Sequence, residues 1–121
     1  MKRVLIVEDQ VDIRELVRLT LELEDFDIQE ADNGDEGLAL ATQWRPDLIL
    51  LDVMMPGSLD GIAVCKRIKG DPSMKKVKVI ILSAKGQDSD RHQGQQAGAD
   101  GYLTKPFSPK QLLETVTKFI G

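Results

Sequence analysis

Residue types that mark several other classes of protein are scarce in this chain of 121 residues. It has one cysteine, Cys65, which excludes an intrachain disulfide and a cysteine-based metal cluster and suits a reducing compartment. We expect Cys65 to be a small core residue. The single histidine, His92, has no second histidine to share a metal with, so we expect a solvated surface residue.

Long apolar runs and clustered positive charge are also missing. The longest apolar runs, such as residues 48–51, are far too short to cross a bilayer, and the first residues lack the apolar stretch of a signal peptide. The net charge is -4 and the basic residues are scattered, unlike those of a nucleic-acid binder. These absences predict a cytoplasmic protein that by itself contacts neither a membrane nor a nucleic acid.

The remaining composition fits one globular unit. Hydrophobic residues make up 41% and charged residues 30% of the chain, which is an ordinary mixture for a folded domain. No composition shift marks a boundary, so we expect residues 1–121 to form a single domain.

Short apolar runs of strand length alternate with segments of helical spacing. The expected strands are Val4–Val7, Asp27–Ala31, Leu48–Leu51, Val79–Leu82 and Tyr102–Leu103. Helix starts are marked by Asn33, Asp60 and Ser108, which are good N-cap residues. Strands that alternate with helices run parallel through right-handed crossovers, and continuously apolar strands are covered on both faces. The pattern predicts an α/β fold with a doubly wound five-stranded parallel sheet and five helices.

One segment fits this pattern poorly. Residues 87–96 contain no large apolar side chain, and Gly94 costs a helix interior roughly 1 kcal/mol relative to alanine. We therefore expect the fourth helix to be short or mobile.

Polar residues follow the apolar strands at the point where each strand ends. In open α/β sheets the working crevice lies beyond the carboxyl ends of the strands. The residues found there are Glu8, Asp9, Asp52, Ser83 and Lys105. Three carboxylates that meet repel one another unless a cation neutralises them, and Mg²⁺ prefers such oxygen ligands. A single aspartate at a strand end is often only a cap or turn residue. That interpretation is weaker here because three carboxylates follow two strands.

Four segments in this order resemble the receiver domains of response regulators across essentially the whole chain: VLIVEDQ, LILLDVMMPG with its DG, VIILSAKG and AGADGYLTKPF. The resemblance implies strand order 2-1-3-4-5 in a flavodoxin-like three-layer sandwich. It also implies a phosphoacceptor domain of a two-component system rather than a turnover enzyme.

The resemblance assigns a role to each polar residue. Asp52 would be the nucleophile that accepts a phosphoryl group, and Lys105 and Ser83 would contact the phosphoryl oxygens. Mg²⁺, for which Mn²⁺ can substitute, would be held by Glu8, Asp9, Asp52 and the backbone carbonyl of Met54. The bond between Lys105 and Pro106 would be cis.

The signal would leave through a conformational switch. Ser83 would move toward the phosphoryl group and Tyr102 would rotate inward, which changes the surface of the fourth helix, fifth strand and fifth helix; Tyr102 could instead be an ordinary half-buried aromatic. Met54 and Lys85 occupy positions that tune hydrolysis, and they predict a long-lived phosphorylated state. The chain also carries one residue more than usual near Ser58.

The resemblance implies partners but leaves their identity open. The donor would be a sensor histidine kinase, a phosphotransfer protein or a small phosphodonor. The output would be a separate effector or a covalently linked domain, and a phosphorylation-linked dimer remains open. The sequence disfavours three other functions. A flavin or nucleotide site is disfavoured by the acidic loop EDQVD. A hydrolase is disfavoured because Val53 and Met54, which follow Asp52, supply no partner carboxylate, and a pseudo-receiver is disfavoured by the complete acidic set.

Overall fold

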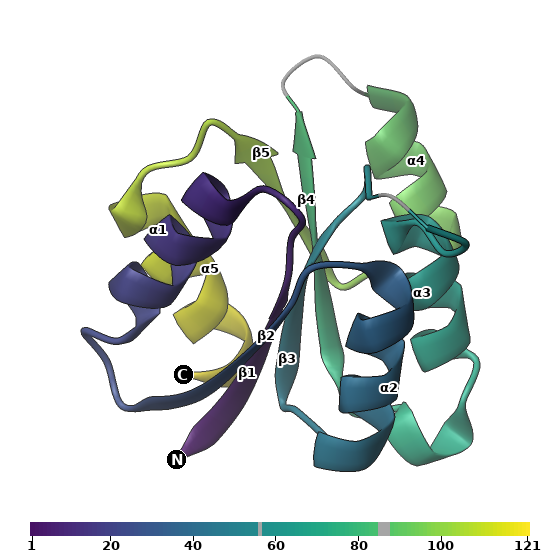
Figure 1. Ribbon diagram of the computed structural model, residues 1–121, viewed down its shortest axis with the longest axis horizontal. Helices are drawn as coiled ribbons and strands as arrows, with labels where there is room; N and C mark the ends of the chain where they lie inside the picture. The colour runs from purple at the N-terminus through teal and green to yellow at the C-terminus, as the bar shows by residue number, and fades with distance from the viewer. Residues whose placement is uncertain (56, 85–87) are drawn as a thin grey trace.

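The computed structural model describes residues 1–55, 57–84 and 88–121. Within them, strands and helices alternate along the chain (Figure 1). The elements are β1 (Lys2–Val7), α1 (Val11–Leu21), β2 (Phe26–Ala31), α2 (Gly34–Trp44), β3 (Leu48–Asp52), α3 (Gly61–Lys69), the 3-10 turn η1 (Pro72–Met74), β4 (Lys78–Ala84), α4 (Asp88–Gln96), β5 (Gly101–Lys105) and α5 (Pro109–Ile120).

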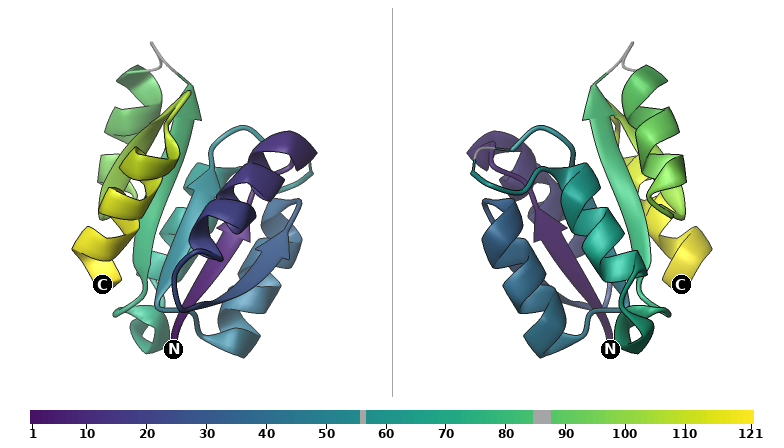
Figure 2. Two further views of the ribbon diagram at one scale, coloured as in Figure 1. Left: turned by 90° about the vertical axis from the view of Figure 1, so that its left-hand side faces the viewer. Right: turned by 90° about the vertical axis from the view of Figure 1, so that its right-hand side faces the viewer.

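All strand pairings are parallel, in the order β2-β1-β3-β4-β5. Helices α1 and α5 cover one face of the sheet, and α2, α3 and α4 cover the other (Figures 1 and 2). The three-layer α/β sandwich and its strand order are therefore as expected from the sequence. The order matters for function because it places β1 and β3 side by side at the centre.

The central strands are buried on both faces because their side chains alternate between two cores. Each core contains two side chains from each of the strands β1, β3 and β4. The helices on that face of the sheet pack against them. On the α1 and α5 side lie Val4, Ile6, Leu48, Leu50, Ile80 and Leu82. On the α2, α3 and α4 side lie Leu5, Val7, Ile49, Leu51, Val79 and Ile81.

Side-chain caps begin three of the helices where the sequence predicts them. Asn33 accepts a hydrogen bond from the backbone N–H of Glu36, and Asp60 accepts one from Ala63. Ser108 forms a complete capping box with Gln111, with Pro109 in the first turn. These caps satisfy backbone donors that the helix itself leaves unpaired, so they fix where each strand-to-helix loop ends.

Helix α4 is short, at nine residues, and Gly94 is its one buried residue. Its predicted mobility stays a prediction. His92 is exposed, and Cys65 is fully buried in the core, where burial raises the pKa of its thiol to about 11. None of the helices in the described residues has the length and apolar content of a membrane span.

Candidate functional site

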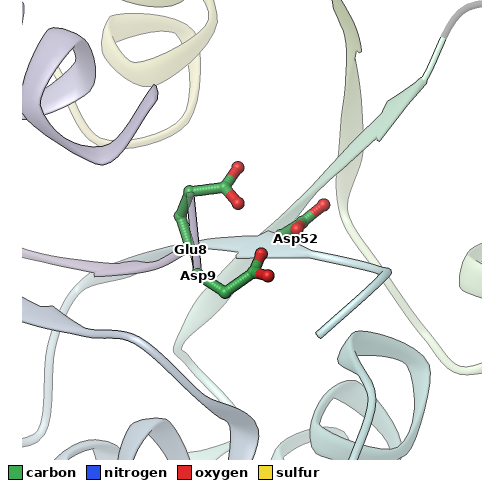
Figure 3. A group of neighbouring side chains, drawn as sticks. All are labelled: Glu8, Asp9 and Asp52. Carbon is green, nitrogen blue, oxygen red and sulfur yellow. The ribbon is translucent and has the colours of Figure 1, made fainter. Parts of the chain in front are cut away.

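Three carboxylates lie together where β1 and β3 end (Figure 3). Asp52 is the last residue of β3, and Glu8 and Asp9 directly follow β1. The parallel register pairs Val7 with Leu51, so the next residue of each strand carries an acid at the same edge. Carboxylate oxygens of the three residues lie within 4.8 Å of one another. Glu8 is fully buried and Asp52 is 5% exposed, so these charges are largely removed from water.

An ammonium group contacts two of these acids. Lys105 ends β5, and its Nζ lies 2.6 Å from Glu8 Oε1 and 3.1 Å from Asp52 Oδ1. The peptide bond that follows, between Lys105 and Pro106, is cis. In the described residues this lysine forms the ion pairs that partly neutralise the acidic cluster.

The charges shift each other's proton affinity. Burial, followed by the hydrogen bond and the charge of Glu8, raises the pKa of Asp52 to about 7, and Lys105 only partly opposes this. Burial lowers the pKa of Lys105, but the hydrogen bond to Glu8 and the charges of Asp52 and Glu8 outweigh it and raise that pKa overall. A bound dication would favour the ionised form of Asp52 and so lower its pKa.

A hollow of about 460 Å³ is lined by two of the acids, Asp9 and Asp52. Ser83, the residue after the β4 position paired with Asp52, lines it and is 6% exposed. Met54 also lines it, with a side chain that is largely exposed. The full lining is Asp9, Gln10, Asp52, Val53, Met54, Ser83, Ala84, Asp90 and Lys105.

The donor set fits a hard divalent cation. Three carboxylates within 4.8 Å of one another supply hard oxygen ligands, and the adjoining hollow leaves room for water and phosphate oxygens. Mg²⁺ typically binds through one or two carboxylates and keeps several waters, which matches these groups. The lining of this hollow contains no thiolate or imidazole, and the one sulfur among its side chains is the thioether of Met54.

The remaining predicted residues lie near the site or outside the described residues. Tyr102 packs on the core beside α4, and Arg91 lies 5.4 Å from its ring centroid. The Tyr102 hydroxyl is buried without a hydrogen-bond partner among the described residues. Ser58, near the extra residue, donates a hydrogen bond to the Asp35 carboxylate at 2.9 Å, which ties its loop to α2. Lys85 lies outside the described residues.

Sequence reasoning did not single out three further residues at the site. The backbone N–H of Gln10 donates to Glu8 Oε2 at 3.3 Å, and Asp90 lines the hollow. The guanidinium of Arg14 donates to the backbone carbonyl of Glu8 at 2.8 Å. An arginine in the first turn of an amphipathic helix looks like a solvated surface residue, so the sequence carries no signal for this contact.

Comparison with known proteins agrees with this geometry. The family described as "Response regulator receiver domain" matches residues 4–117. The transcriptional regulatory protein ResD of Bacillus subtilis is 47% identical over 92% of this chain and 45% of its own length. The transcriptional regulator RpaA of Synechocystis is 45% identical over 96% of this chain and 48% of its own length. The chain thus spans about half the length of these relatives.

Solved structures share the fold over the whole chain. The chemotaxis protein CheY4 of Vibrio cholerae is 32% identical with a TM-score of 0.91, covering 99% of each chain. The receiver domain of NtrX from Brucella abortus is 30% identical with a TM-score of 0.89, covering 97% of each.

A parallel sheet with an acidic cluster beyond its strand ends, matched by these relatives, defines a signalling domain of the two-component class. The chain belongs to the response regulator receiver domain family. A phosphoacceptor role is general in this family, whose members are signalling proteins rather than turnover enzymes.

Proposed function

We propose that Asp52 is the phosphoacceptor of this chain. A carboxylate oxygen of Asp52 would attack phosphorus in line, forming an O–P bond as the bond to the donor's leaving group breaks. The observation that carries this proposal is the position of Asp52, which lines the hollow beside two further acids and lies 3.1 Å from the Lys105 ammonium.

Glu8, Asp9, Asp52 and the backbone carbonyl of Met54 would hold Mg²⁺ or Mn²⁺. When bound, the dication supplies positive charge that offsets the acids and the incoming phosphoryl oxygens. It would also keep Asp52 ionised, and therefore nucleophilic, at neutral pH, because it would oppose the burial and the Glu8 contact that raise the pKa of this carboxyl to about 7.

Lys105 and Ser83 would hold the phosphoryl oxygens. The Lys105 ammonium can pivot from the carboxylates toward a phosphoryl oxygen as a mobile point charge. The Ser83 hydroxyl lines the same hollow and can donate to another oxygen. Neither movement requires the sheet to rearrange, because both residues lie at strand ends.

The output would be a shift of the surface formed by α4, β5 and α5, with Ser83 and Tyr102 as the switch. Residues 1–121 would be one receiver domain that takes its phosphoryl group from a sensor histidine kinase, a phosphotransfer protein or a small phosphodonor. The matched relatives are transcriptional regulators about twice as long as this chain, which supports an output domain linked to the receiver domain. The other possible output is a separate effector protein. Phosphorylation-linked dimerisation would serve either.

Hydrolysis of the acyl phosphate would be slow. Met54 lines the hollow with a side chain that cannot orient an attacking water by hydrogen bonding. The alternative function is a pseudo-receiver that signals by protein contacts alone, and the complete acidic cluster favours the phosphoacceptor.

Intact-mass spectrometry tests the proposal. The chain is incubated with acetyl phosphate and Mg²⁺, with EDTA in place of Mg²⁺ as one control. We expect one added phosphoryl group in the wild type, none in Asp52→Asn, and a normal level in Asp27→Asn, which alters an exposed carboxylate on β2. Equal labelling of wild type and Asp52→Asn, or no labelling of either by any donor, would contradict the proposal.

A further inference from the structure

Arg14 connects the acidic cluster to the neighbouring strand. It lies in the first turn of α1, and its side chain is 20% exposed. Its Nη1 donates to the backbone carbonyl of Glu8 at 2.8 Å, and its Nε lies 3.3 Å from Glu30 Oε1. One guanidinium therefore bridges β2 and the loop that carries two of the three carboxylates.

This contact completes the anchoring of the loop backbone. The Glu8 N–H donates to the Ala31 carbonyl at 3.1 Å, continuing the β1–β2 ladder by one residue. The Glu8 carbonyl has the Arg14 guanidinium as its donor, just where the chain leaves the sheet and turns into α1. Glu8 is thus held through both of its backbone polar groups, and the bond to its carbonyl orients the peptide unit that joins Glu8 to Asp9.

The charge of Arg14 is compensated where it lies. A bare guanidinium near a cation site would repel the cation. Here Glu30 pairs with Arg14 through one oxygen and with Arg18 through the other, at 3.3 Å each. Arg18 in turn pairs with Glu22 at 3.0 Å. The loop therefore gains a strong charge-assisted hydrogen bond from Arg14, while the glutamates offset most of the positive charge that Arg14 would otherwise bring near the cation site.

We propose that Arg14 is a positioning residue for the divalent-cation site: by clamping the Glu8 carbonyl it sets the direction of the Glu8 and Asp9 carboxylates. This inference rests on the proposed function, since it assumes that these carboxylates bind Mg²⁺. Partners that orient metal ligands in this way typically contribute 10- to 100-fold to metal affinity.

The test compares Arg14→Met with Arg18→Met. Both variants remove one arginine from α1 and one partner from Glu30, so they change the net charge equally, but Arg18 does not contact Glu8. Calorimetric titration with Mg²⁺ is expected to show binding weakened about tenfold in Arg14→Met and less than twofold in Arg18→Met. Equal effects in the two variants, or tighter binding in Arg14→Met, would overturn the proposal.

Two further readouts separate positioning from a general loss of structure. In the metal-free protein, amide hydrogen exchange at Gln10 should accelerate in Arg14→Met and stay unchanged in Arg18→Met. With acetyl phosphate, Arg14→Met should need more Mg²⁺ but reach the wild-type rate at saturation. A lower saturated rate with unchanged Mg²⁺ affinity overturns the positioning role alone, whereas a wild type that binds no Mg²⁺ overturns the proposed function as well.

Discussion

Adding one methyl group to α4, in Gly94→Ala, should destabilise the protein although alanine is the better helix former. In an unobstructed helix this change stabilises by roughly 1 kcal/mol. Here a Cβ on residue 94 would lie 2.9 Å from Tyr102 Cε1 and 3.2 Å from Ile81 Cγ1. Overpacking of this kind costs about 1–3 kcal/mol. The net loss in the free energy of unfolding should therefore be about 0–2 kcal/mol.

The Tyr102 ring is the neighbour that can move away from a Cβ on residue 94. Its hydroxyl is buried without a hydrogen-bond partner among the described residues, and it can hydrogen-bond to water when the ring turns outward. In a Tyr102→Ala background the closest contact is gone and only the 3.2 Å contact with Ile81 Cγ1 remains, so Gly94→Ala should become stabilising by up to about 1 kcal/mol. The double-mutant cycle is then expected to give a coupling energy of about 1–3 kcal/mol.

Equilibrium urea unfolding of the four proteins, in EDTA at constant pH, measures this coupling. Gln93→Ala, at an exposed position of the same helix, serves as the control and should change stability by less than about 0.5 kcal/mol. If Gly94→Ala stabilises the protein equally in both backgrounds, the ring does not lie against the helix and the reasoning fails.

Three further predictions concern the acidic edge and its loop. In EDTA the folded chain retains the Asp52 proton between the carboxyl's ordinary pKa of 3.8 and its raised value of about 7. Wild type should therefore lose stability relative to Asp52→Asn as pH rises through that window, and Mg²⁺ should abolish the trend; parallel urea midpoints at pH 5 and pH 8 would contradict it. Lys105→Met removes the cation that pairs with Glu8 and Asp52. At pH 8 in EDTA this should lower the free energy of unfolding by on the order of 2–3 kcal/mol, which is less than the loss from breaking a fully buried ion pair, and the loss should be smaller at pH 5. Ser58→Ala removes one exposed hydrogen bond to Asp35 and should lower the free energy of urea unfolding by less than about 1 kcal/mol. The phosphorylation rate should stay unchanged, and a slower rate would show that this loop does contact the phosphodonor.

The sheet could be predicted because its central strands carry a strong local signal. Runs such as Leu48–Leu51 are apolar throughout, and a parallel strand covered on both faces buries such a run completely. The meeting of Glu8 and Asp52 then follows from topology, since the carboxyl ends of parallel neighbours share one edge. Local signals did not give the strand order, because alternating strands and helices are compatible with several orders, and the family resemblance supplied it.

Contacts that depend on side-chain direction could not be predicted in the same way. The sequence treats Gly94 as a helix weakness, whereas the structure shows a space that Tyr102 fills. Lys105, the last residue of β5, was expected to meet a phosphoryl group, but in the structure its Nζ lies closer to Glu8 than to Asp52. Arg14 was missed because its contact with Glu8 depends on the geometry of the turn between them, and residue types alone do not predict that geometry.

The charges at the edge of the sheet explain why a dication would be needed after phosphorylation as well as before it. With Asp52 ionised, Lys105 neutralises one of the three carboxylates and leaves two negative charges in a largely buried cluster. An acyl phosphate on Asp52 carries nearly two negative charges in place of one. The modified site would then hold about three uncompensated charges without a cation, and about one with Mg²⁺ bound. Chelation after labelling should therefore destabilise the phosphorylated chain more than the unmodified one, and an equal EDTA effect on both urea midpoints would contradict this electrostatic account.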